Sequence, residues 1–178
     1  MTPMIPMLKR DWIEFQRHAL FTILFWVLIP SLIHTLLAIP LSQFIFLDIR
    51  YLNWSAAGVW ISSAGMIAFI ETANRLRKIR FETNQIDAIL QSPVTNLELL
   101  FVILLRGIIF GFCQFIFALC ITAVLHHEYF GIINILFITL QMLVVISFFS
   151  AIGTIFGLLI SNGKIFIQSS FILFLLLS

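Results

Sequence analysis

Four long, nearly uncharged apolar runs constrain the fold of this chain more than any other feature of its sequence. They occupy residues 20–41, 56–73, 97–125 and 131–161. A membrane-spanning α-helix needs about 20 apolar residues to cross a hydrocarbon core of about 30 Å. Because that core offers no water to backbone groups, each run must satisfy its own hydrogen bonds as a helix. The sequence therefore predicts an all-α, polytopic helical membrane protein.

Composition supports this class and narrows the possible functions. Hydrophobic residues make up 61% of the chain and charged residues 10%, with a mean hydropathy of +1.11, whereas soluble proteins carry about 25% charged residues. The net charge of +2 indicates no nucleic-acid partner, because the basic residues follow membrane topology instead. Cys113 and Cys120 share one apolar run. We expect two small packing residues there, with no redox or metal role.

Three further segments complete the predicted architecture. Residues 1–19 mix large apolar side chains with charges, which predicts an amphipathic helix at the membrane interface; a frayed basic terminus is the alternative. Residues 80–92 repeat Ile and Leu at helical spacing among charged residues, which predicts a cytoplasmic helix between the second and third spans. Residues 165–178 begin a fifth apolar segment. It is too short to cross, so we expect a truncated fifth span.

Basic residues are distributed very unevenly between the two sides of the predicted membrane. Arg50 lies in an outer loop and Arg106 within a span. The other eight lie in inner segments: Lys9, Arg10, Arg17, Arg75, Arg77, Lys78, Arg80 and Lys164. Such an excess marks the cytoplasmic side. We expect a cytoplasmic amino terminus in a bacterial-type inner membrane, with the first span kept as an anchor because it lacks a cleavage site.

A defined corner is predicted between the cytoplasmic helix and the third span. Pro93 ends the helix, and Thr95-Asn-Leu-Glu98 has the form of a capping box directly before an apolar run. Arg106 follows about two turns inside that run. It either reaches the inner interface on its long stem or contacts the corner through Glu98 or Asp87. The first interpretation only anchors the helix end, whereas the second would stiffen the corner against the third span.

Two local features predict how the spans pack and bend. Gly107 and Gly111 form a Gly-x-x-x-Gly pair, which favours close approach of another helix. Pro30 is expected to kink the first span, with Ser31 and Thr35 bonding backbone groups that the proline releases. We therefore expect a tightly packed third span beside a bent first span.

Ionisable residues are sparse inside the predicted spans. His34 is either a hydrogen-bonded packing residue or part of a proton relay. Glu71 is either paired with Arg75 one turn later or a buried carboxylate that serves transport. The outer run His126-His-Glu128 cannot converge on one ion, so no metal site is predicted. No constellation of acids, bases or nucleophiles indicates catalytic residues.

Taken in order, these elements resemble the membrane subunit of type 2 ABC exporters. The stretch Ile86-Asp-Ala-Ile-Leu-Gln-Ser-Pro-Val-Thr-Asn-Leu-Glu98 is similar to that family's acidic, Leu-rich sequence before Ser/Thr-Pro. The residues from Gly153-Thr-Ile-Phe-Gly157 through Lys164 to Ser169-Ser170 resemble its fourth span, inner loop and fifth span. Asn84-Gln85 stand where the family often has Gly-Thr.

The resemblance implies a permease subunit of an ATP-driven exporter, working as a homodimer or beside a second permease. A separate ABC ATPase subunit would dock on the coupling helix, through Arg80, Glu82, Ile86, Asp87, Leu90 and Pro93. Helix corner and packing are assigned to Thr95, Glu98, Arg106, Gly107 and Gly111. No Walker loop occurs, so ATP is expected on the partner and no cofactor in this chain. The alternatives are an ion-coupled carrier using Glu71, His34 and Arg106, or a membrane-embedded enzyme.

Overall fold

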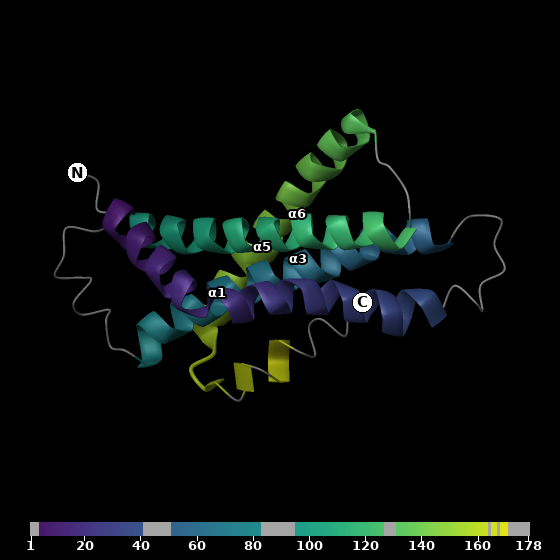
Figure 1. The fold of residues 1–178 in the computed structure, drawn as a ribbon. Coiled ribbons are helices and arrows are strands. Elements are labelled where there is room, and N and C mark those ends of the chain that lie inside the picture. The colour runs from purple at the N-terminus through teal and green to yellow at the C-terminus, as the bar shows by residue number, and fades with distance from the viewer. Residues whose placement is uncertain are drawn as a thin grey trace.

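The computed structural model describes residues 4–40, 51–82, 95–126, 131–163, 165–166 and 168–170. Within these residues the long elements are all helices (Figure 1). They are α1 (Met4–Ile33), the π-helix η1 (His34–Ala38), α3 (Tyr51–Arg77), the π-helix η2 (Lys78–Glu82), α5 (Asn96–His126) and α6 (Ile132–Leu159). Four segments are long and apolar enough to cross a membrane: Phe15–Leu36, Ser55–Phe81, Asn96–Leu125 and Ile132–Leu159. The predicted all-helical class is confirmed.

The central helix of the bundle is α3. More than half of its apolar window is buried, against less than a third in each other span. It packs along both α5 and α6, and its buried face carries small residues such as Ala64, Ala68 and Thr72. The helix extends beyond the predicted span 56–73 at both ends. A helix can pass the edge of the hydrocarbon without a break, because its backbone bonds are internal on either side.

Glycines bring α5 and α6 into direct contact with the backbone of α3. A Cβ atom added at Gly111 would lie 3.1 Å from the carbonyl oxygen of Ala64, and one added at Gly157 would lie 2.6 Å from that of Ala73. Gly107 likewise faces Thr72 and Ser150. The Gly-x-x-x-Gly pair of α5 therefore lies at a three-helix crossing. Close backbone approach of this kind is how membrane helices gain packing energy without a hydrophobic driving force.

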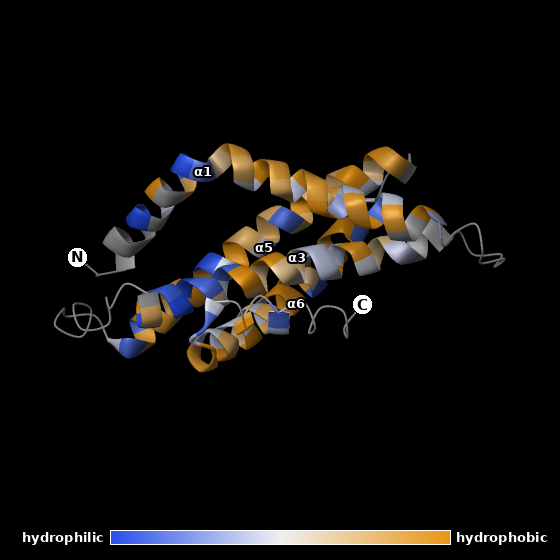
Figure 2. Cartoon of the chain, turned by 90° about the horizontal axis from the view of Figure 1, so that it is seen from below, coloured by the Kyte–Doolittle hydropathy of each residue, from blue (hydrophilic) through white to orange (hydrophobic). Residues whose placement is uncertain are grey.

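By contrast, α1 is peripheral and packs mainly on α5. Aromatic rings fill this contact: the Phe110 ring of α5 lies edge-on to Phe15 at 5.5 Å and to Trp26 at 5.8 Å between centroids. The helix is continuous from Met4 to Ile33, although a separate interface helix was expected over 1–19. Its amino-terminal part slants away from the rest and is more hydrophilic (Figures 1 and 2). The expected interface helix and the first span are thus one helix that changes direction.

Burial along α6 is uneven. Its buried residues all lie between Met142 and Gly157, and its first turns are exposed. Figure 1 shows the amino-terminal half of α6 projecting away from the other helices. The sequence explains the difference. Ser150, Gly153 and Gly157 give the carboxyl-terminal half a small face for α3, whereas the amino-terminal half carries large aliphatic and aromatic side chains.

Candidate functional site

An arginine joins the carboxyl-terminal end of α3 to the end of α6. The π-helix η2 continues α3 directly, and from it Arg80 donates a hydrogen bond through Nη1 to the carbonyl oxygen of Leu158 at 2.6 Å. Leu158 lies in the last turn of α6, where carbonyl groups have no partner inside the helix. A cationic side chain is favourable at that negative helix end. Arg80 therefore holds two helices together at the carboxyl-terminal ends of their spans.

A second arginine, one turn earlier, strengthens the same junction. Arg77 is buried, with 8% of its surface exposed. Its Nη2 donates to the side-chain oxygen of Asn74 at 3.1 Å, and its Cζ lies 5.7 Å from the ring centroid of Phe166. Phe166 also stacks on Phe69 of α3 at 6.3 Å. The chain just after α6 is thus packed back onto α3.

The helix that follows the corner begins with a reciprocal cap. The Thr95 backbone N–H donates to Glu98 Oε2 at 2.9 Å, and the Glu98 backbone N–H donates to Thr95 Oγ1 at 3.3 Å. This is the capping box predicted from the sequence. It fixes the direction in which α5 enters the bundle.

The predicted ATPase-coupling residues are only partly described. Arg80 and Glu82 lie in η2, at its middle and its end. Ile86, Asp87, Leu90 and Pro93 lie outside the described residues, as does most of the segment 80–92. The guanidinium of Arg80 was expected to serve a partner subunit, and the structure shows it bonded within the chain. A guanidinium has five N–H donors, so Arg80 can bond Leu158 and still donate to a partner subunit.

An ion pair links the carboxyl-terminal half of α3 to the amino-terminal half of α5. Arg106 approaches Glu71 Oε2 at 3.2 Å through both Nε and Nη2. The two side chains are largely shielded, with 11% of Arg106 and 29% of Glu71 exposed. From the sequence, Glu71 was expected either to pair with Arg75 or to be a buried carboxylate that serves transport. Arg106 was expected either to reach the membrane interface or to contact Glu98 or Asp87. Glu98 instead serves the cap, and the pair joins residues 35 positions apart.

A buried amide at the middle of α5 was not identified from the sequence. Gln114 is fully buried and donates through Nε2 to the carbonyl oxygen of Trp26 in α1 at 3.1 Å. Pro30 lies four residues after Trp26 and has no N–H, so it leaves this carbonyl without its helical partner. Ser31 and Thr35 bond other carbonyls of α1, at 2.7 and 2.9 Å. Gln114 therefore completes the proline site from a neighbouring helix.

A second buried polar junction ties three helical elements together near the opposite end. The Thr122 hydroxyl donates to the Ala118 carbonyl at 2.9 Å, and it contacts Trp60 Nε1 and His34 Nε2 at 2.9 Å each. Because a hydroxyl has one proton and two lone pairs, Thr122 accepts from both rings. This hydrogen-bond network assigns the Nε2–H tautomer to His34. The packing alternative for His34 is the one that these contacts support.

His34 lies far from the Glu71–Arg106 ion pair. His34 and the Glu71 carboxylate contact α5 at Thr122 and at Arg106 respectively. At a rise of about 1.5 Å per residue, those positions lie about 24 Å apart along α5. The structure therefore brings Glu71 and Arg106 together and leaves His34 in a separate cluster.

Among the residues that the structure describes, no group of three or more His, Cys, Asp or Glu side chains could hold a metal ion. Comparison of the chain with protein-family models, curated proteins and solved structures gave no match. The arguments for function therefore rest on the residues and contacts of this chain.

Proposed function

We propose that this chain is the permease subunit of an ATP-driven ABC exporter, coupled to a separate ATPase subunit. One observation carries the proposal. The segment 83–94 runs between two fixed ends: η2, which Arg80 bonds to α6, and the capping box that starts α5 at Thr95. A force delivered to either flank of this segment would pass into a helix that is anchored in the bundle. The resemblance of residues 82–106 to the family's coupling region supports the same assignment.

Force applied at this corner reaches all three helices of the packed core. On one side it enters α3 and, through Arg80 and Leu158, the end of α6. On the other side it enters α5 through the capped first turn. Glycine-mediated contacts then bind α3, α5 and α6 into one body, because closely packed helices move together more readily than they deform. The ATPase would therefore move the core as a unit.

The rest of the assignment follows from this role. The chain would sit in a bacterial-type inner membrane with its amino terminus and the basic end of α3 on the cytoplasmic side, facing the ATPase. Two permeases, identical or related, would enclose the path for cargo. ATP would be bound and hydrolysed on the partner, with no catalytic residue in this chain.

An ion-coupled carrier built on Glu71, His34 and Arg106 is less well supported. A proton or ion relay needs neighbouring groups along a continuous path. His34 and the ion pair contact α5 about 24 Å apart, and the residues buried between them along α5 are mostly apolar, with the Gln114 amide as the main polar group. That amide is already bonded to the backbone of α1.

The test is charge reversal on the corner. Where a neighbouring reading frame encodes an ABC ATPase, Glu82→Lys with Asp87→Lys should abolish copurification of that ATPase with the chain and should lower the ATP turnover of the complex. Gln16→Lys is a matched control, because it adds a positive charge at an exposed position of α1. Unchanged ATPase binding and turnover in the double variant would refute the coupling role.

A further inference from the structure

The Glu71–Arg106 pair leaves one carboxylate oxygen open. Both contacts from Arg106 reach Oε2, and no hydrogen bond within the described part of the chain reaches Oε1. Glu71 keeps 29% of its side chain exposed, more than twice the fraction of Arg106. An ionised carboxylate accepts several hydrogen bonds, so this acceptor is only partly used. In a membrane span, an ionisable group of this kind indicates a functional site.

An aromatic ring lies against the arginine of the charged pair. The Cζ atom of Arg106 lies 5.2 Å from the ring centroid of Phe110. Phe110 in turn contacts Phe15 and Trp26 of α1, at 5.5 and 5.8 Å between centroids. The charged pair is therefore next to aromatic rings from two helices, through its arginine. Such a combination suits a molecule with one polar end and one apolar end.

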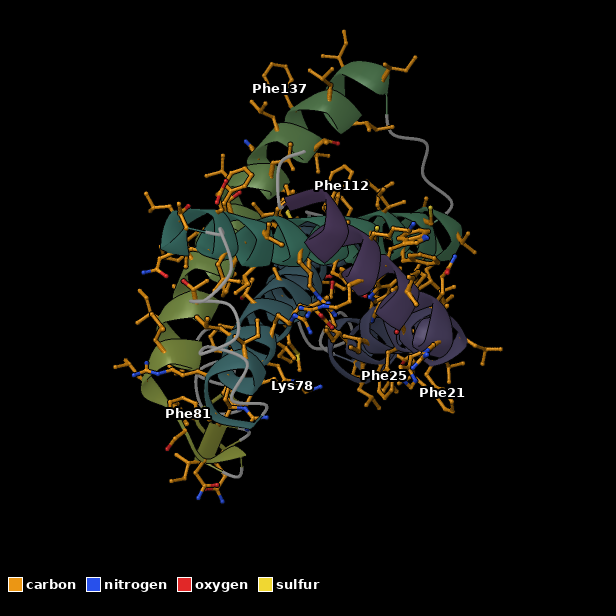
Figure 3. The ribbon with its side chains drawn as sticks, turned by 90° about the vertical axis from the view of Figure 1, so that its left-hand side faces the viewer. Phe21, Phe25, Lys78, Phe81, Phe112 and Phe137 are labelled. Carbon is orange, nitrogen blue, oxygen red and sulfur yellow. The ribbon has the colours of Figure 1, made fainter. Side chains whose placement is uncertain are left out.

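The position of the pair along α3 matches the depth of a lipid-like molecule. Glu71 precedes the exposed Lys78 by seven residues, about 10 Å along the helix. Figure 3 shows Lys78 extending from the end of α3 on the side where Phe25 of α1 lies. Charged side chains such as Lys78 belong at headgroup level. The carboxylate lies one to two turns deeper, where headgroups meet acyl chains.

The charges of Glu71 and Arg106 indicate which chemical group a bound ligand would place at this site. Arg106 offsets the charge of Glu71, so the polar end of a ligand needs no positive charge of its own to approach the open oxygen. A hydroxyl group can donate to Oε1 and brings no charge into the membrane, which keeps its desolvation cost small. We propose that Glu71, Arg106 and Phe110 form a binding site for an uncharged amphiphile that has hydroxyl groups at its polar end. That this amphiphile is the cargo rests on the exporter function proposed above.

Binding can be measured without any ATPase. The full chain is placed in nanodiscs of phosphatidylcholine, whose headgroup has no hydrogen-bond donor, and bound ligand is counted by mass spectrometry of the intact protein. The probes are a monoacylglycerol, with two hydroxyls, and its di-O-methyl ether, which keeps size and charge but donates nothing. We expect the ether to bind at least about tenfold more weakly, which corresponds to about 1.4 kcal/mol.

A double variant tests the site itself. Glu71→Leu with Arg106→Met removes both charges together, a replacement that membrane-buried pairs tolerate better than loss of one partner. It should erase the preference for the monoacylglycerol, whereas Ser147→Ala, which removes an exposed hydroxyl on α6, should keep it. Equal binding of monoacylglycerol and ether by the natural chain would overturn the proposal, and so would stronger binding of an anionic or cationic lipid. Copurification of the ATPase is a separate readout, so either proposal can fail without the other.

Discussion

The buried hydroxyl of Thr122 gives the sharpest test of how α1 is attached. Thr122→Val keeps the shape of the side chain and removes the acceptor for Trp60 Nε1–H and His34 Nε2–H. Hydrogen bonds between membrane helices contribute about 0.6 kcal/mol on average and up to about 1.7 kcal/mol. Two such bonds give an expected loss of about 1 to 3 kcal/mol in the free energy of unfolding. Reversible unfolding in mixed micelles, followed by circular dichroism, measures this loss.

A double-mutant cycle separates the Trp60 bond from general packing. With Trp60→Phe in both backgrounds, the coupling energy should be about 0.6 to 1.7 kcal/mol. Thr35→Val is the matched control, because the Thr35 hydroxyl is exposed and bonds only carbonyls of its own helix. Its effect should stay within about 0.5 kcal/mol. A Thr122→Val chain as stable as the control, or a cycle that is additive, would refute the proposed junction.

Three further substitutions test other contacts by the same unfolding assay. Gly153→Val should destabilise the chain by about 1 to 3 kcal/mol, because its Cβ would lie 2.6 Å from a backbone oxygen of α3; Gly58→Ala, with nothing within 4 Å, should not. Gln114→Leu should cost about 0.6 to 1.7 kcal/mol, and less in a Pro30→Ala background, which restores the N–H for the same carbonyl; an equal cost in both would contradict the pairing. Thr95→Ala should cost about 1 kcal/mol and speed hydrogen exchange at the start of α5, and unchanged exchange would contradict the cap.

Local sequence signals predicted the existence of the helices, and the ends of α5 and α6 more closely than those of α1 and α3. The apolar runs gave all four membrane-length helices, because length and hydropathy act within a segment. The capping box at Thr95 and Glu98 was also visible, since its two residues are three positions apart. The slant within α1 was not visible, because no proline or glycine lies between Pro6 and Leu20 to mark a change of direction. The five-segment count stays a prediction, since most of 165–178 lies outside the described residues.

Contacts between helices were largely hidden in the sequence. Glu71 and Arg106 are 35 positions apart, and periodicity says nothing about pairing over that distance. Gln114 was recognisable only as an amide inside an apolar run, which indicates a polar contact but not its partner. The sequence does hold one hint: Pro30 has no N–H for the Trp26 carbonyl, so that carbonyl needs a donor from another helix. Only the packed helices identify that donor.

The attachment of α1 to α5 also has a consequence during synthesis. The bonds from Gln114 to Trp26 and from His34 to Thr122 each join residues 88 positions apart. A ribosome adding about 5 to 20 residues per second needs about 4 to 18 s to make that interval. During that time the first helix remains in the bilayer or the insertion machinery. The His34 imidazole and the Trp26 carbonyl must then form hydrogen bonds with temporary partners. The first helix can dock only when the helix that carries its permanent partners arrives.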